Sequence, residues 1–280
     1  FATGFSIAAF HAPAPAMIGR ISGNQVGKGM SLFMASGELS RTVGPLIAVW
    51  AVTNWTLDGI YRLAVIGWVA SLLLFWRLRS IPARSEPAGS LRAILPALRT
   101  LYLPLLTFVL FRNFLNVSLT TYLPTYMKSL GSTLLIAGAA LSILELAGVA
   151  GALLSGTISD RLGRKPILLF ATLASVIFML IFLNVEGWLV VPLLLALGFS
   201  TLSTPPVLMA IVQEQLPNHR ALANGLFLSM SFLLRSFSLL AFGYLGDSVG
   251  LEAAYLISAL LSLLAIPAIF ILPQVQATQT

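Results

Sequence analysis

The chain has 280 residues, of which 58% are hydrophobic and 9% are charged, and its mean hydropathy is +0.95. A soluble domain carries about 25% charged residues, so this composition excludes an ordinary water-soluble domain. The net charge is +7, and cysteine is absent, which excludes disulfide bonds and thiolate metal sites.

Nine apolar stretches are long enough to cross a membrane as helices. A hydrocarbon core of about 30 Å takes roughly 20 helical residues. In chain order, we predict spans at residues 1–19, 29–53, 60–77, 100–127, 132–156, 166–184, 187–212, 221–245 and 251–272. The predicted fold class is all-α, a polytopic membrane protein built as a helical bundle.

Basic residues alternate between successive connections. One set of connections holds Arg20, Lys28, Arg77, Arg79, Arg84, Arg92, Arg99, Arg161, Arg164, Lys165 and Arg220. The opposite set holds only Arg62 and Lys128. Because connections rich in Lys and Arg stay in the cytoplasm, we predict a multi-pass protein of the cell (inner) membrane with a cytoplasmic C-terminus. Phe1 then enters from outside, and the net charge reflects topology rather than nucleic-acid binding.

An internal repeat relates the two parts of the chain. A shift of 194 residues aligns Gly4-Phe5-Ser6 with Gly198-Phe199-Ser200, Asn24 with Asn218, and Arg41 with Arg235. Parallel repeats of this kind build secondary transporters from two halves. Since the second copy starts near Thr100, we expect about 95 residues and three further spans before Phe1 in the native protein.

The repeat divides the chain into four parts. Residues 1–79 form the C-terminal part of the first transmembrane half, with three spans, and this half is incomplete. Residues 80–99 form a Pro-containing cytoplasmic linker, whose composition is typical of a flexible interfacial segment. Residues 100–273 form the second half, with six spans, and residues 274–280 form a cytoplasmic tail.

Ionisable side chains within the spans are candidates for function, because each costs about 2.5–3.5 kcal/mol at a helix centre. They are His11, Glu38, Arg41, Arg112, Glu145 and Arg235. Glu38 and Arg41 share one helix face at i and i+3, so they either neutralise each other or serve gating or substrate binding. Arg235 has no acid within one turn, so its partner lies on another helix or is a bound anion.

Arg112 and Glu145 lie on consecutive antiparallel spans joined near Leu130. At about 1.5 Å per residue their depths are about 27 and 22 Å, a mismatch that long side chains can bridge. We predict that they pair and that Glu145 takes up a proton in coupling; a permanent interhelical ion pair is the alternative. Arg112 also heads a polar stripe that faces water or another helix, formed with Asn113, Asn116 and Thr120.

Two predicted spans contain proline breaks at corresponding positions. The breaks are at Pro13 and Pro15 and at Pro205 and Pro206, and the repeat aligns His11 with Pro205. Paired broken spans indicate a binding site near the membrane midplane, whereas packing kinks are the alternative. We expect His11 to line this cavity or to bond a freed backbone carbonyl, with a proton-carrying role as the alternative.

Residues 156–165 read Gly-Thr-Ile-Ser-Asp-Arg-Leu-Gly-Arg-Lys, which we interpret as a short charged loop between two spans. The pattern resembles the G-x-L-(A/S)-D-(R/K)-x-G-(R/K)-(R/K) loop signature of the major facilitator superfamily of secondary transporters, with Ile158 at the Leu position. The resemblance implies a bundle of two halves that works by alternating access. It also implies that the loop latches the halves together on the cytoplasmic side without contacting substrate.

Within this loop the residue types predict separate roles. Gly156 and Gly163 allow a close helix approach and a tight turn. Asp160 is expected to accept hydrogen bonds from the start of the next helix or to pair with a basic neighbour. The three basic residues hold the loop in the cytoplasm and can bridge to acids on other helices; they are Arg161, Arg164 and Lys165.

Further segments narrow the resemblance to the fosmidomycin-resistance-type drug exporters. These segments are residues 2–11, 29–34, 213–217 and 224–227, together with Gly44-Pro45. The Gly-Pro pair also resembles the antiporter motif of the fifth span, from which this chain departs by having Ser31, Ser40, Ala48 and Val49 at the usual glycine positions.

No catalytic motif and no filter-like loop is present in the sequence, so we expect neither an enzyme nor a channel, and neither a cofactor nor a metal. We predict a monomeric secondary transporter that couples protons to the export of a small drug-like or anionic compound across the lipid bilayer. An anionic group is favoured because Arg41, Arg112 and Arg235 outnumber the acids at depth. The alternative is a truncated, transport-inactive or receptor-like remnant of such a transporter.

Overall fold

The computed structural model of the chain describes residues 2–11, 13–79 and 96–273, and these residues form helices and turns without any strand. The helices are α1 (Ala2–His11), α2 (Pro13–Ile21), α3 (Val26–Trp55), η1 (Leu57–Leu63), α4 (Ala64–Leu78), η2 (Leu98–Tyr102), α6 (Leu103–Val117), η3 (Ser118–Tyr122), α7 (Leu123–Ser129), α8 (Leu134–Leu162), α9 (Arg164–Phe182), η4 (Gly187–Leu189), α10 (Val190–Thr201), α11 (Thr204–Gln215), α12 (Arg220–Val249), α13 (Leu251–Leu263) and α14 (Ile266–Ile271). The predicted all-α fold is confirmed. Most of the predicted linker, residues 80–95, and the predicted tail lie outside the described residues.

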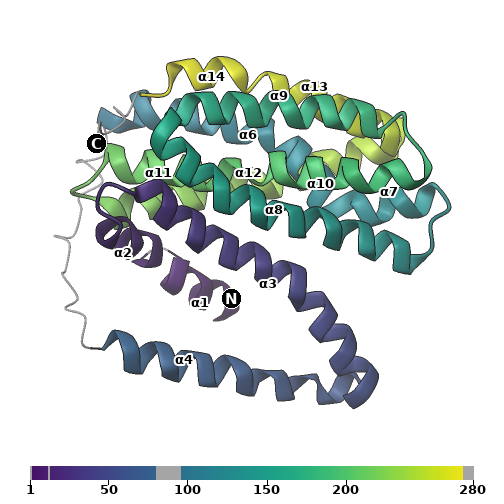
Figure 1. Ribbon diagram of the computed structural model, residues 1–280, viewed down its shortest axis with the longest axis horizontal. Coiled ribbons are helices and arrows are strands. Elements are labelled where there is room, and N and C mark those ends of the chain that lie inside the picture. Colours follow the sequence, from purple (N-terminus) through teal and green to yellow (C-terminus); the bar gives the residue numbers. More distant parts are fainter. Residues whose placement is uncertain (1, 12, 80–95, 274–280) are drawn as a thin grey trace.

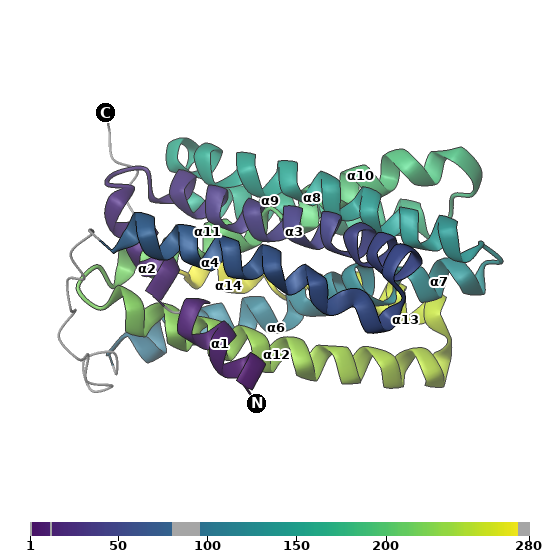
Figure 2. The ribbon, with the colours of Figure 1, turned by 90° about the horizontal axis from the view of Figure 1, so that it is seen from below.

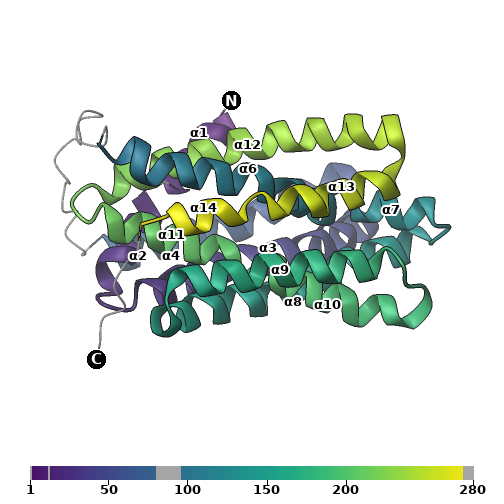
Figure 3. The same cartoon turned by 90° about the horizontal axis from the view of Figure 1, so that it is seen from above.

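The long helices run roughly along the longest axis of the molecule (Figure 1). Helix α8 packs against both α3 and α10, so it joins the N-terminal helices to the rest of the bundle. Helix α4 runs along the edge of the bundle, on the far side of α3 from α8 (Figure 1), and almost all of its described side chains are exposed. Seen from above, α13 and α14 run along the middle of the second half, with α6 on one side and α9 on the other (Figure 3).

Seven segments within the described residues are long and apolar enough to cross a membrane. They are Leu57–Arg77, Arg99–Ser129, Leu135–Leu162, Arg164–Phe182, Gly187–Gln215, Arg220–Val249 and Leu251–Ile271. The two other predicted spans differ in character. The first corresponds to two short helices, α1 and α2, on either side of Ala12, which is outside the described residues, and the second is α3, which carries Lys28, Glu38 and Arg41.

The predicted internal repeat is confirmed by the helix boundaries. Helices α3 and α12 each have 30 residues, and their boundaries differ by the same shift of 194 residues. The same shift places the end of α2 at the end of α11. Figure 2 shows α3 and α12 as two long ribbons running in roughly the same direction, with α12 along the lower edge of the bundle. The two halves therefore use equivalent helices around one interior.

Close backbone contact holds α8 and α10 together. A Cβ atom on Gly151 would overlap the carbonyl oxygen of Phe199, and one on Gly198 would overlap that of Leu144. In lipid, burial of apolar surface gives helices little reason to associate, so small residues that let backbones approach are a main source of packing energy. These two glycines are therefore what allows α10 to lie flush on α8.

The segment Arg99–Ser129 is interrupted by a π-helical turn, η3, between α6 and α7. A π-turn widens the helix and leaves carbonyl groups partly free, and such turns are frequent at functional sites. The hydroxyl of the fully buried Tyr255 donates to the Ser118 carbonyl at 2.6 Å, and the hydroxyl of Tyr122 donates to the Leu239 carbonyl at 3.0 Å. These bonds fix the π-turn against α13 and α12, which sets the orientation of the polar residues of α6.

Candidate functional site

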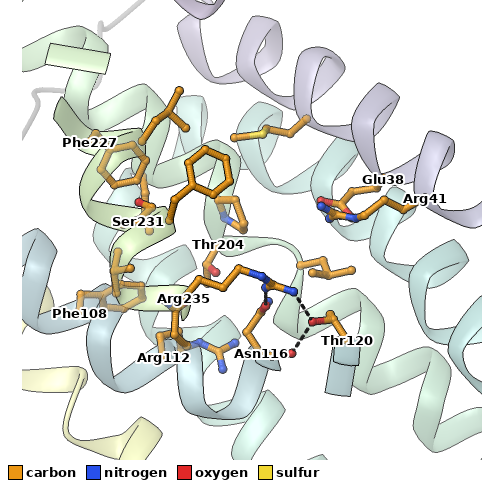
Figure 4. A pocket seen from close by; sticks show the side chains of 18 of the residues that line it. Glu38, Arg41, Phe108, Arg112, Asn116, Thr120, Thr204, Phe227, Ser231 and Arg235 are labelled. Atoms are coloured by element: carbon orange, nitrogen blue, oxygen red, sulfur yellow. Dashed lines mark hydrogen bonds and ion pairs between the residues drawn. The ribbon is translucent and has the colours of Figure 1, made fainter. Parts of the chain in front are cut away.

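A cavity of about 290 Å³ opens between α3, α6, α8, α11 and α12. Its lining combines apolar side chains, such as Phe108 and Phe227, with polar and charged ones. Every ionisable residue predicted from the sequence to lie at depth reaches this cavity: His11, Glu38, Arg41, Arg112, Glu145 and Arg235. The polar stripe of Asn113, Asn116 and Thr120 lines it as well. Figure 4 shows the labelled side chains of this lining converging from several helices on one space.

Two carboxyl groups share one guanidinium on the wall of the cavity. Arg41 Nη2 pairs with Glu38 on its own helix, and Arg41 Nε lies 3.7 Å from Glu145 Oε2 on α8. Both glutamate side chains are buried, each being 7% exposed. The contact with Glu145 crosses from α3 to α8, so this cluster connects the two parts that the repeat defines.

The predicted pairing of Arg112 with Glu145 is wrong. Arg112 Nη1 instead donates to Ser262 Oγ on α13 at 3.3 Å, while Glu145 faces Arg41. The prediction assumed an uninterrupted α-helix back from Leu130, but η3 inserts a π-turn between that point and Arg112. Because a π-turn changes the rotation and rise of the helix, it turns Arg112 away from α8.

Arg235 finds its partners on another helix, within the predicted polar stripe. Its Nη1 donates to Asn116 Oδ1 at 2.7 Å, and its Nη2 donates to Thr120 Oγ1 at 3.0 Å (Figure 4). Thr120 lies in the π-turn, which is where α6 departs from regular geometry. The stripe therefore faces α12 and the cavity together.

The second predicted helix break is present. Helix α10 ends at Thr201 and α11 begins at Thr204, with Pro205 and Pro206 in its first turn, where the missing N–H groups have no helical acceptor to lose. Pro205 lines the cavity, and so does His11, its equivalent in the repeat. Pro13 and Pro15 lie in the first turn of α2.

The segment read as a loop, residues 156–165, is mostly helix, which corrects the prediction. Helix α8 continues to Leu162, and α9 begins at Arg164. Only Gly163 breaks the chain, with φ of 90°, a left-handed conformation that glycine adopts without strain. Gly156 lies within α8 and serves packing, because a Cβ there would overlap the carbonyl oxygen of Gly27 and the hydroxyl of Ser31 on α3.

Asp160 caps the start of α3, a helix far away in the sequence. The N–H groups of Gly27 and Lys28 donate to its two carboxylate oxygens, each at 3.0 Å. The N-cap residue of α3, Gln25, makes no side-chain capping bond of its own. A carboxylate at a helix N-terminus both satisfies free N–H groups and faces the positive end of the helix dipole. Asp160 therefore ties α8 to α3.

Arg164 anchors this cap to a third helix. Its Nη2 lies 2.6 Å from Asp160 Oδ1, and its guanidinium also pairs with both carboxylate oxygens of Glu214 on α11, with Nε to Oε2 at 3.3 Å. Nearby, the Gly156 N–H donates to Ser31 Oγ at 3.0 Å. We refer to these residues, Gly27, Ser31, Gly156, Asp160, Arg164 and Glu214, as the latch. Arg161 is exposed, and Lys165 Nζ donates to the Phe270 carbonyl at 2.8 Å.

Sequence reasoning missed three of these partners. Ser31, Glu214 and Ser262 were not singled out as site residues, because nothing in the sequence says which other helix each of them meets. Gly27 was the one available hint of the contact between α3 and α8, because Gly27 and Gly156 are small residues at the point where these two helices touch.

A helical bundle with charged groups around a central cavity, closed at one end by interhelical polar contacts, is the architecture of a membrane carrier. The comparisons narrow this class. The sequence pattern of the Major Facilitator Superfamily matches residues 1–239 and 145–279. The chain belongs to the Major Facilitator Superfamily, and it is an integral, multi-pass membrane protein of a family of secondary transporters.

Two curated relatives match nearly the whole chain. The fosmidomycin resistance protein of Escherichia coli (strain K12) is 24% identical over 277 residues, which cover 96% of this chain and 68% of that protein. The uncharacterized MFS-type transporter YfnC of Bacillus subtilis (strain 168) is 23% identical over 296 residues, covering 99% of this chain and 70% of that protein.

Solved structures share the fold at low sequence identity. The E. coli fucose:proton symporter FucP has a TM-score of 0.72 at 15% identity and covers 97% of this chain and 74% of its own. The human organic anion transporter MFSD10 (TETRAN) has a TM-score of 0.72 at 16% identity and covers 92% of this chain and 67% of its own. Both matches support the two-half bundle of this family.

Proposed function

We propose that this protein exports a small drug-like or anionic compound in exchange for protons, by alternating access of the central cavity. The observation that carries the proposal is the cluster of Glu38, Arg41 and Glu145, in which one guanidinium joins carboxyl groups from α3 and α8. The named activity of the E. coli relative, fosmidomycin resistance, supports a drug as the exported compound.

The cluster couples proton binding to the packing of α3 against α8. When Glu145 is ionised, it attracts Arg41 across the helix boundary, and the two helices are held together at this depth. When Glu145 takes up a proton, that attraction is lost while Arg41 keeps Glu38 as its partner on α3. Proton binding therefore weakens the contact between helices without leaving Arg41 unpaired in the membrane, which would be costly.

Substrate binding uses the remaining charges of the cavity. Among its lining residues are three arginines and two glutamates, so one positive charge is uncompensated there. Apolar side chains on α6 and α12, such as Phe108 and Phe227, supply surface for the uncharged part of a ligand. An amphipathic compound with an acidic group matches this lining.

The latch serves as the cytoplasmic gate of this cycle. It joins α3, α8 and α11 at the end of the molecule where Lys28, Arg161 and Lys165 cluster. Opening the cavity toward that side requires the cap of α3 by Asp160 to break. The substrate itself has no contact with the latch in this proposal.

Inside-out vesicles that carry a proton gradient test the coupling. A substrate added to them should collapse the gradient, and Glu145→Gln should abolish the collapse because a neutral amide cannot exchange a proton. Glu186→Gln, an exposed acid in the α9–α10 connection, is the matched control and should behave like the unmodified protein. Collapse that persists in Glu145→Gln would leave export standing and make the cluster a structural ion pair. No response to any anionic or amphipathic drug would count against drug export.

A further inference from the structure

Arg112 is a buried cation whose donors are mostly unused. The residue is 4% exposed, and only Nη1 has a partner among the described residues, namely Ser262 Oγ. Its Nε and Nη2 atoms are buried and have no hydrogen-bond partner in the described part of the chain. A guanidinium stays protonated in proteins, and burying it without an acceptor is unfavourable. The guanidinium of Arg112 therefore lacks the anionic partner that a buried cation needs.

The groups around Arg112 are donors as well. The Nδ2 atom of Asn113 is buried without a partner, and so is the hydroxyl of Ser258, one turn before Ser262 on α13. The Ser262 hydroxyl accepts from Arg112 through its oxygen, so its own proton remains available. Helices α6 and α13 pack together here and contribute donors from both sides.

The carboxyl groups that line the cavity are committed elsewhere. Glu38 and Glu145 both face Arg41. The other deep arginine, Arg235, is already bound to two oxygen acceptors, Asn116 and Thr120. Figure 4 shows the contrast, with dashed lines from Arg235 to both residues and none from Arg112 to the residues drawn.

We propose that Arg112 is the centre of an anion-binding site at the seam between α6 and α13, open to the cavity. It takes a compact anion, either a halide or an oxyanion group, on Arg112 Nε and Nη2, with the Ser262 hydroxyl and the Asn113 amide as further donors. The anion is a free inorganic ion or the acidic group of a transported compound. In the second case the site rests on the export proposed above; in the first it does not.

Thermal unfolding of the purified full chain in detergent tests the site without any transport. The melting temperature is measured while sodium chloride, sodium phosphate or sodium benzoate replaces sodium gluconate at constant ionic strength. A ligand that binds only the folded state raises the melting temperature saturably. Arg112→Gln should weaken the apparent affinity about tenfold or more, since it removes charge-assisted bonds.

Two further variants keep the test decisive if Arg112→Gln folds poorly. Ser262→Ala removes one hydroxyl from a small, buried position and should weaken the anion response by a few-fold, as expected for one lost hydrogen bond. Arg79→Gln, which removes an arginine from an exposed position at the end of α4 and outside the cavity, is the control and should keep the response of the unmodified protein.

The pattern of outcomes separates a free inorganic anion from the acidic group of a transported compound. It also separates the anion site from the proposed export. Saturation by chloride or phosphate supports a free inorganic anion, and saturation by benzoate alone supports the acidic group of a transported compound. A saturable response in a protein that fails the vesicle assay would leave the anion site standing and count against export. Identical melting in every salt, or an unchanged response in Arg112→Gln, would overturn the site.

Discussion

At the residue scale, the deep charges of this protein fall into three different situations. Arg41 joins two carboxyl groups, Arg235 is held by an amide and a hydroxyl, and Arg112 has one weak acceptor. A charged residue within a span is a candidate for function, because placing a charge inside the membrane costs free energy. The hydrogen-bond and ion-pair partners of such a residue decide which function it can have. Arg41 suits coupling, and Arg112 suits anion binding.

Arg41→Lys should separate charge from geometry in the coupling cluster. Arg41 uses two different nitrogen atoms, Nη2 for Glu38 and Nε for Glu145, whereas a lysine ammonium is a single point charge. We expect Arg41→Lys to retain the pair with Glu38 and to lose the drug-induced collapse of the proton gradient in vesicles. Arg79→Lys, at an exposed position at the end of α4, is the control and should transport normally. Normal coupling in Arg41→Lys would mean that the bridge to Glu145 is not required.

At the element scale, α3 and α8 approach each other through glycine at the latch. A Cβ on Gly27 would meet the Gly156 carbonyl oxygen, the Asp160 carboxylate and the Arg164 guanidinium. One of these is backbone, which cannot move aside as a flexible side chain can. The cap of α3 by Asp160 therefore depends on a small residue at the second position of the helix.

Gly27→Ala should lower the free energy of unfolding by about 1–3 kcal/mol, the usual cost of overpacking. Gly37→Ala on the same helix is the control, because nothing lies within 4 Å of a Cβ placed there. It should be neutral or more stable by up to about 1 kcal/mol, since alanine is the better helix former. Denaturant or thermal unfolding in detergent compares the two variants. Equal stability of both would show that the close approach at Gly27 is not maintained.

At the scale of the whole molecule, the latch and the α7–α8 turn mark opposite ends. Helix α8 has 29 residues and is about 43 Å long, enough to cross a bilayer. Its two ends differ in charge, with Arg161, Arg164 and Lys165 beside one end and Lys128 alone beside the other. The distribution of basic residues predicts that the latch end faces the cytoplasm.

Single cysteines measure this orientation cleanly, since the chain has none of its own. A membrane-impermeant maleimide should label Arg161→Cys in inside-out vesicles only. It should label Ser132→Cys, in the α7–α8 turn, in right-side-out vesicles only. Labelling efficiency in each vesicle type is read from the mass shift of the protein. The reverse pattern would place the latch outside and contradict the cytoplasmic C-terminus.

The sequence by itself determined the large-scale features of this protein. Apolar length predicted the seven segments of the described residues that are long enough to cross a membrane, since a bilayer imposes about the same length on every helix. The shift of 194 residues anticipated that α3 and α12 would be equivalent helices, and it paired His11 with Pro205, which line one cavity. The Gly-Asp-Arg signature indicated the family, which the comparisons confirm.

Only the tertiary structure decided which charges meet. The π-turn at Ser118–Tyr122 turns Arg112 toward Ser262, so Glu145 is left to Arg41, and no periodic pattern in the sequence encodes that change of rotation. Likewise Asp160 caps α3, more than 130 residues away, rather than the helix that follows it. Helix phase and interhelical contact are set by how whole elements pack, because a side chain finds its partner across space and not along the chain.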